Sequence, residues 1–202
     1  MIAQIKRKQY TIDEYLELEI ASEIRSEYCD GEIIPMTGGT PNHNDIAGHL
    51  YILLKSALKG KDYRTFFADQ RLCIPSVSLY TYTYPDVMVI EKPLQLQTGR
   101  TDTVVNPCFM AEVLSKSTRD YDRGDKFAAY RSIESFREYV LIDQYSIHVE
   151  HYVKTAANQW LFSEYDDLNI VLPMSTFEAQ IPIADLYENI EIDPISPPKE
   201  QK

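Results

Sequence analysis

The sequence lacks long apolar runs and paired cysteines, and each absence excludes a class of protein. The longest uninterrupted apolar stretches span only a few residues, whereas a membrane-spanning helix needs about 20. The cysteines, Cys29, Cys73 and Cys108, are an odd number at wide spacings. This spacing fits neither a disulfide framework nor a paired zinc knuckle. We therefore expect a globular protein with reduced thiols.

The N-terminus also lacks the apolar segment of a secretory signal. Its basic residues 6–8 are followed by Asp13 and Glu14 instead, so we expect a cytoplasmic protein. Residues 1–193 are enough for one domain with a continuous core. The proline-containing tail, residues 194–202, is expected to be disordered.

Positive charge is scarce as well. The formal net charge of −11 argues against broad affinity for nucleic acid, because phosphate contacts need Lys and Arg. The acid excess lies at the two ends, however: residues 12–32 hold eight acids against one base, and residues 164–202 hold nine against two. Between residues 116 and 131, five bases outnumber three acids. The middle of the chain is therefore locally basic.

Two short patterns predict the N-terminal elements. Thr11 followed by Glu14 has the form of a capping box, which predicts a helix through about Ile20. The pair Asp30-Gly31 stands between strand-like flanks, and this is a strong signal for a β-hairpin.

Two more helices are predicted further along. The first should be capped by Asn42 or Asn44 and stop at Gly60, because the apolar residues between them recur every three or four positions. The second should be capped by Asp122, with Asp125 three residues on, and should continue to about residue 133.

The apolar runs 87–90, 109–114 and 138–143 predict short buried strands. The last two flank a predicted helix, which indicates a strand–helix–strand crossover in a mixed central sheet. Antiparallel additions are expected at both ends of the chain. The sequence thus predicts an α/β or α+β domain, with a mixed central sheet flanked by helices.

Carboxylates interrupt two of these apolar runs. Asp86 stands at the start of the first run and Glu112 lies inside the second, with Lys126 on the following helix. Asp and Glu are almost never fully buried unless a cation or metal pairs with them, because the charged form loses its hydration. Two such carboxylates on neighbouring strands suggest a metal site.

The same residues could instead form ion pairs that only stabilise the fold. Glu112 could form a buried ion pair with Arg123 or Arg131, since ion-pair networks also bring charges inside. Lys126 could pair with Asp122, four residues before it on one helix face.

At these residues the chain resembles a known family. It is similar to the Uma-type restriction-endonuclease family, a branch of the PD-(D/E)xK nuclease-like superfamily. The segments that carry the resemblance cover nearly the whole chain and are residues 27–32, 41–44, 84–87, 112–115, 121–127 and 138–139. The resemblance implies a restriction-endonuclease-like core of a helix, three strands, a helix and a strand.

The resemblance also implies a chemistry, which is metal-dependent hydrolysis of phosphodiester bonds in DNA. Asp86 and Glu112 match the two acidic motif positions and would hold Mg²⁺ (or Mn²⁺) with the carbonyl of Val113. With Lys126 they would form the catalytic set. Glu32 and His43 are further candidates for lining the site, and the family's fold implies a homodimer.

One departure from the family pattern matters. The superfamily lysine stands two residues after the second acid, where this chain has Leu114. Lys126 could bring its ammonium group to the same space from the helix. The alternative is a catalytically inactive nuclease-fold protein that acts as a binding or assembly module, which the net charge and Leu114 favour. Acidic termini that engage a partner chain are a third possibility.

Overall fold

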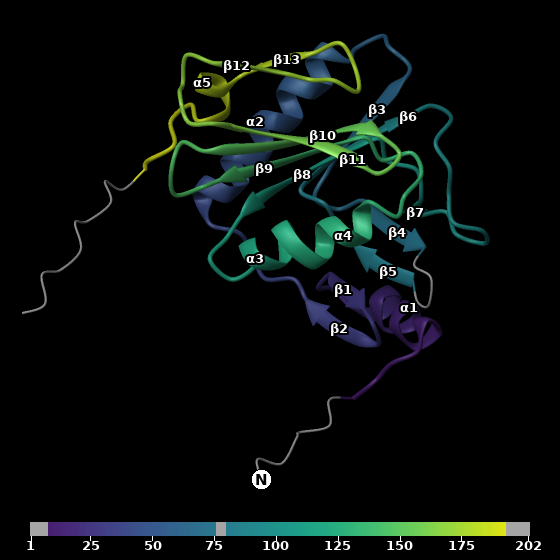
Figure 1. The fold of residues 1–202 in the computed structure, drawn as a ribbon. Coiled ribbons are helices and arrows are strands. Elements are labelled where there is room, and N and C mark those ends of the chain that lie inside the picture. The colour runs from purple at the N-terminus through teal and green to yellow at the C-terminus, as the bar shows by residue number, and fades with distance from the viewer. Residues whose placement is uncertain (1–7, 76–79, 193–202) are drawn as a thin grey trace, which may run out of the picture.

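The computed structural model describes residues 8–75 and 80–192, which fold into two larger sheets and one small sheet with helices packed on them (Figure 1). The predicted disordered tail, residues 194–202, lies outside the described residues. The single domain expected for residues 1–193 stays a prediction. Within the described ranges, no helix is long and apolar enough to cross a membrane.

The N-terminal predictions are confirmed. Helix α1 (Ile12–Ala21) begins with the capping box, in which the Thr11 hydroxyl accepts from the Glu14 amide and the Glu14 carboxylate accepts from the Thr11 amide. Strands β1 (Ser26–Cys29) and β2 (Glu32–Pro35) form the predicted hairpin. Asp30 and Gly31 both have positive φ, as a two-residue primed turn requires.

The hairpin is the edge of a five-stranded sheet in the order β2-β1-β5-β4-β7. This sheet uses β4 (Arg71–Pro75), β5 (Tyr80–Thr83) and β7 (Thr103–Val104). Tyr15 of α1 packs on Tyr28 and Tyr82 in the small core that joins the helix to this sheet. The N-terminal addition is thereby held beside the central strands.

The second sheet has six strands in the order β11-β10-β9-β8-β6-β3. Its strands are β3 (Tyr63–Phe67), β6 (Val87–Glu91), β8 (Phe109–Leu114), β9 (Glu138–Asp143), β10 (Val149–Ala156) and β11 (Gln159–Tyr165). Strands β8 and β9 are parallel and the other neighbours antiparallel. The predicted mixed sheet and its crossover are confirmed, and the protein is a mixed α+β fold.

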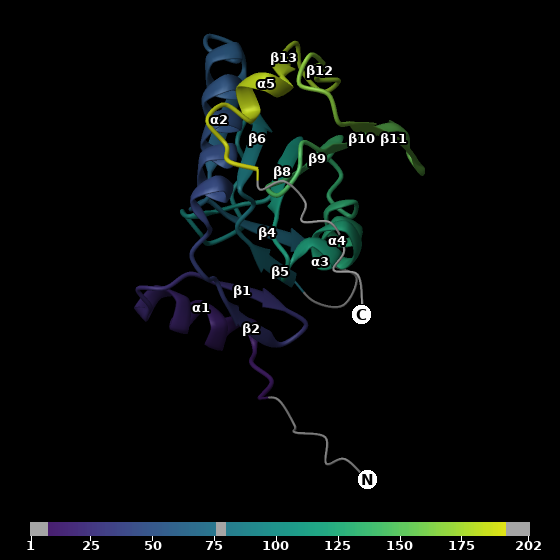
Figure 2. The ribbon, with the colours of Figure 1, turned by 90° about the vertical axis from the view of Figure 1, so that its left-hand side faces the viewer.

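Helices cover both faces of this sheet (Figure 2). Helix α2 (Pro41–Ala57) packs on one face, where β6 and β8 present Val87, Val89, Phe109, Ala111 and Val113. The helical segment between β8 and β9 packs on the other face, against the alternate residues of the same strands. The hairpin of β12 (Val171–Pro173) and β13 (Gln180–Pro182), followed by α5 (Ile183–Leu186), completes the core on the α2 side.

Helix α2 begins earlier than predicted. Its N-cap is Thr40, whose hydroxyl accepts from the His43 amide at 3.2 Å, and Pro41 is its first residue. The prediction that Asn42 or Asn44 caps this helix is therefore wrong. Proline is favoured at the first helical position, because its missing N–H would have no partner there.

The segment between β8 and β9 also departs from the prediction. It consists of α3 (Arg119–Tyr121), a π-helical segment η1 (Asp122–Lys126) and α4 (Phe127–Tyr130). Asp122 does not cap a helix, because the helical turns start three residues before it and its side chain is buried. Its carboxylate faces Lys126, so it contributes to an internal ion pair instead.

Candidate active site

The strand register brings Asp86 and Glu112 side by side. Val87 pairs with Ala111 in the antiparallel β6–β8 ladder, so the residues one step further out, Asp86 and Glu112, are neighbours across the two strands. The Asp86 amide lies 3.4 Å from Oε2 of Glu112. The two carboxylates that the sequence singled out therefore meet at the end of these strands.

Asp86 is held on the side of helix α2. Its Oδ2 accepts from the Val113 amide at 2.8 Å and lies 3.2 Å from Nε2 of His43. Burial lowers the pKa of His43, but the hydrogen bond and charge of Asp86 outweigh this effect, so the pKa of His43 is raised overall. His43 can thus donate to Asp86 and fix the direction of its carboxylate. The other ring nitrogen, Nδ1, is buried without a hydrogen-bond partner.

Glu112 is held on the opposite side, by the helical segment. Its Oε1 lies 3.0 Å from Nζ of Lys126 and accepts from the Tyr130 hydroxyl at 2.7 Å. The side chains of Glu112 and Lys126 are only 5% and 8% exposed. The arginine partners considered for Glu112 lie elsewhere, since Arg123 pairs with Glu150 and Arg131 lies over the Phe127 ring.

Lys126 has two more carboxylate neighbours. Its Nζ lies 3.3 Å from Glu27 of β1 and 3.6 Å from Asp122, four residues earlier in the chain. The Glu27 carboxylate also accepts a short hydrogen bond from the hydroxyl of Thr83 on β5. One ammonium group therefore lies among three carboxylates that come from three parts of the chain.

This arrangement shifts the pKa of each partner. Burial, together with the nearby Asp86 and Asp122, raises the pKa of Glu112 to about 8 against the opposing effect of Lys126. Burial also raises the pKa of Asp122. Burial alone would lower the pKa of Lys126, but the three carboxylates raise it well above its usual value. The lysine stays protonated at neutral pH, and the site carries more acids than its cations balance.

The position of Leu114 explains why the lysine comes from the helix. Leu114 is 1% exposed and packs with Phe127 and Tyr130 in the core beneath the helical segment. Side chains two residues apart on a strand share a face, so Glu112 points to the same side as Leu114. The helix that covers this face carries Lys126 to Glu112, while Leu114 fills the apolar core.

These groups line one cavity of about 520 Å³. Its walls include the segment that joins β2 to α2, the polar turn at residues 115–118 and Tyr145 after β9. Gln144 connects two of these walls, because its amide donates to the Leu114 carbonyl at 2.8 Å and its oxygen accepts from the Thr40 hydroxyl. The start of α2 is thereby tied to the end of β8.

The structure brings together most of the residues that the sequence singled out. Asp86, Glu112, Val113, Lys126 and His43 all line the cavity, and Glu32 is not among its lining residues.

Glu27, which sequence reasoning did not assign to the site, lines the cavity from the strand paired with Glu32's strand. Alternation along β1 buries Ser26 and Tyr28 and so predicts an outward Glu27. The signal that could have found Glu27 was the family-like segment 27–32, in which it is the first residue.

The ligands that the cavity offers suit a metal ion that keeps several waters better than one that needs four protein ligands. Among residues 8–75 and 80–192, no three His, Cys, Asp or Glu side chains are arranged so that they could hold a metal ion. Mg²⁺ is commonly bound through only one or two carboxylates and keeps several waters, whereas structural Zn²⁺ needs four protein ligands. The hard oxygens of Asp86 and Glu112, together with the excess of acids, fit an ion of the first kind.

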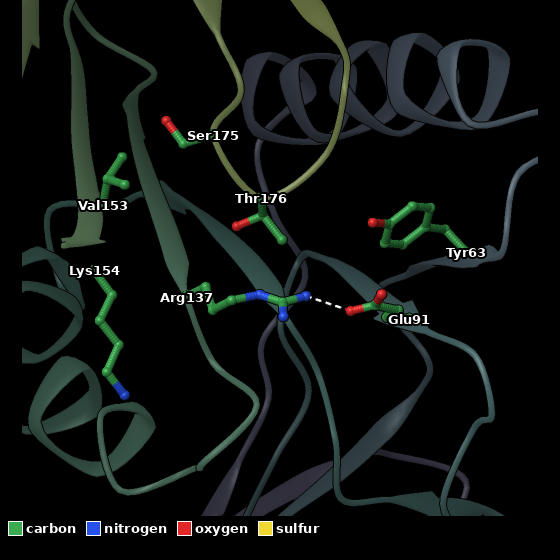
Figure 3. Close-up of a pocket in the computed structure, with 7 residues that line it drawn as sticks. All are labelled: Tyr63, Glu91, Arg137, Val153, Lys154, Ser175 and Thr176. Atoms are coloured by element: carbon green, nitrogen blue, oxygen red, sulfur yellow. Dashed lines mark hydrogen bonds and ion pairs between the residues drawn. The ribbon is translucent and has the colours of Figure 1, made fainter. Parts of the chain in front are cut away.

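A second cavity of about 250 Å³ lies at the other end of β6 (Figure 3). Its charged groups are Glu91, Arg137 and Lys154, and the first two form an ion pair with each other. Of the described residues that line this cavity, Glu91 alone carries a carboxylate. The cavity therefore lacks the features that make the first cavity a candidate active site.

Two curated proteins are similar to this chain over most of its length. The chain is 40% identical over 164 residues to uncharacterized protein sll1609 of Synechocystis sp., covering 81% of this chain and 92% of that protein. It is 35% identical over 153 residues to uncharacterized protein slr1290 of the same organism, covering 76% of this chain and 78% of that protein.

A solved structure shares the fold. The crystal structure of a putative nuclease belonging to DUF820 from Anabaena variabilis superposes with a TM-score of 0.71 at 20% identity, covering 88% of this chain and 97% of that chain. The model of the Uma2 family, whose description is "Putative restriction endonuclease", matches residues 12–184. The chain therefore belongs to the Uma2 family.

Proposed function

We propose that this protein is a Mg²⁺-dependent endonuclease that hydrolyses phosphodiester bonds in DNA. Membership of a family of restriction-endonuclease-like proteins supports a nuclease-like function, and such families generally use divalent metal ions. Mg²⁺ is the proposed ion, and Mn²⁺ the one expected to replace it. Asp86, Glu112 and the carbonyl of Val113 are the proposed ligands.

One observation carries this proposal: the ammonium group of Lys126 lies 3.0 Å from Glu112 although the usual lysine position holds Leu114. The ammonium, Glu112 and Asp86 all line one cavity. A charged lysine buried without a chemical task would be an expensive feature, because desolvation of an ion pair often exceeds its Coulombic gain. Two carboxylates that can hold a metal ion, with a cation beside them, are suited to stabilising the charge that develops in phosphodiester hydrolysis.

Each side chain has a proposed task. His43 orients Asp86, and Tyr130 orients Glu112, through the hydrogen bonds described above. Lys126 donates toward the attacking water and stabilises the negative charge that develops on the phosphate oxygens, as preorganised donors do. The ion, when bound, would supply positive charge that polarises the phosphate.

The proposed enzyme would act as a homodimer in the cytoplasm. The three cysteines are free thiols, which suits that compartment. Strand β11 pairs with no strand on its outer side within the described residues, and its Leu161 and Phe162 are 56% and 46% exposed. Such an edge is a ready template for pairing with a second copy.

Loss of either carboxylate should abolish cleavage. Asp86→Ala and Glu112→Ala are each expected to lower the rate of plasmid nicking in Mg²⁺ by about 100-fold or more, because the ion loses a ligand. EDTA should abolish nicking by the unmodified protein, and Mn²⁺ should restore it. Asp166→Ala changes an exposed acid outside the cavity and is the matched control. Absence of both nicking and Mg²⁺ binding in the unmodified protein would favour an inactive binding module.

Removal of the ammonium group should separate catalysis from metal binding. Lys126→Met is expected to reduce cleavage by about 100- to 1,000-fold, the usual effect of removing one preorganised donor. Mg²⁺ binding, measured by calorimetry, should persist because the carboxylates remain. If the Lys126→Met variant cleaves at the normal rate, Lys126 has a structural role and no catalytic one.

The raised pKa of Glu112 predicts how stability depends on pH without metal. Between its unfolded value of 4.5 and its folded value of about 8, the folded chain binds a proton that the unfolded chain does not. Stability should therefore fall as pH rises through this window. Glu112→Gln should remove that part of the fall, so the melting temperature of the variant should change less across this window than that of the unmodified protein. Melting temperatures measured in EDTA across this pH range test whether stability falls as pH rises.

The dimer can be tested by light scattering. We expect a mass about twice the 23.4 kDa of one chain, and a monomer for Phe162→Glu, because that change brings like charges together at a symmetric strand edge. Leu168→Glu alters a residue of similar exposure outside β11 and should stay dimeric. A monomeric mass for the unmodified protein at every concentration would refute this part of the proposal.

A further inference from the structure

We infer that the cavity accepts single-stranded DNA, an end or an unpaired stretch, in preference to intact duplex. This inference rests on the proposed function and narrows its substrate. Three independent features of the cavity support it: the depth of its acidic groups, its charge and the character of its rim.

The groups that would act on a phosphate lie deep in the cavity. The side chains of Asp86, Glu112 and Lys126 are 18%, 5% and 8% exposed. A phosphate must therefore enter the cavity to reach them. The volume of about 520 Å³ lies within the range of about 300–1,000 Å³ that holds small molecules, so it fits one or two nucleotides. A flexible strand can insert such a unit, whereas a duplex is stiff over far longer distances.

The charge of the cavity does not suit a duplex. Among the residues that the structure describes, four acids line it, and the lysines that line it are Lys116 and Lys126. Lys126 is buried among three carboxylates, and its proposed task is at the reacting phosphate. Lys116 is exposed and can contact a neighbouring phosphate of the strand. Proteins that grip duplex DNA typically neutralise about 6–10 phosphates, and this lining offers no such series.

The rim of the cavity has what a single strand needs. Tyr145 is 37% exposed, and Nζ of Lys116 lies 5.0 Å from its ring centroid. Its backbone is fixed, because the Tyr145 amide donates to Oδ1 of Asp143 at 2.6 Å. Ile34, 43% exposed, and Met36 add apolar surface from the β2–α2 segment. Aromatic rings beside a cation are how proteins hold unpaired bases without reading sequence.

The polar turn at the rim adds phosphate donors. The hydroxyl of Ser115 is within 3.1 Å of Ser117 and 2.9 Å of Thr118, and all three residues line the cavity beside Lys116. Hydroxyl groups and one lysine match the backbone of a single strand that passes over the rim, with a base against Tyr145.

Fluorescence anisotropy with the full chain tests this directly. The probes are a fluorescein-labelled single strand of mixed sequence, the blunt duplex of the same sequence, and that duplex with a single-stranded tail, in Ca²⁺ to suppress cleavage. We expect the single strand and the tailed duplex to bind about fivefold or more tighter than the blunt duplex. Equal or tighter binding of the blunt duplex, or no binding of any probe, would overturn the inference.

Two rim variants make the test specific. Tyr145→Ala should weaken binding of the single strand by about fivefold or more, while Tyr145→Phe, which keeps the ring, should not. Lys116→Ala should lower the slope of log K against log salt by about 0.7, the contribution of one phosphate contact on a single strand. If Tyr145→Ala binds the single strand as tightly as the unmodified protein does, no base stacks on Tyr145 and the inference is refuted.

Failure of this inference and failure of the proposed function give different results. Tight binding of the single strand without cleavage in Mg²⁺ would leave the inference standing and refute the nuclease. Cleavage of blunt duplex without any preference for the single strand would support the nuclease and refute the inference.

Discussion

The contact between Lys126 and Glu112 is the interaction on which the rest of the site depends. It joins the helical segment to the central sheet near the end of β8, the strand that carries Glu112 and Leu114. Both side chains are almost fully buried, so removing Lys126 would leave Glu112, Glu27 and Asp122 without the cation they share, at a cost of about 3–5 kcal/mol. The pair therefore holds the helical segment in place and at the same time places an ammonium group beside the carboxylates.

The helical segment is short and depends on the core for its stability. Isolated helices of so few residues are unstable in water, and this one depends on Phe127 and Tyr130, which pack into the core. The π-helical turn lies directly before these anchors and contains both Asp122 and Lys126. Such turns are frequent at functional sites. Here the turn and the residues directly after it present two charged and two aromatic residues to the interior.

Much of the fold could be predicted because its signals are local. The capping box of Thr11 and the Asp30-Gly31 turn depend on a few neighbouring residues, and both were confirmed. Neighbouring strands for Asp86 and Glu112 followed from two apolar runs. The start of α2 was missed because the sequence favoured asparagine caps, although Pro41 with Thr40 before it is the better start.

The full site depended on contacts that no local pattern contains. Glu27 reaches Lys126 only because β1 pairs with β5, a neighbour more than fifty residues away in the chain. Alternation along β1 even predicts that Glu27 faces outward. The π-helical turn was equally hidden, since the sequence of residues 122–126 is compatible with an ordinary helix start.

The bridge made by Gln144 has a consequence for how a strand of DNA could enter. Because this side chain fastens the first turn of α2 to the last residue of β8, His43 and Glu112 sit on a single stiff frame. Any widening of the entrance must come from parts outside that frame. The β2–α2 segment and the hydroxyl-rich turn after β8 are the parts of the rim that can move. Access to the cavity and the chemistry inside it are therefore governed by different stretches of the chain.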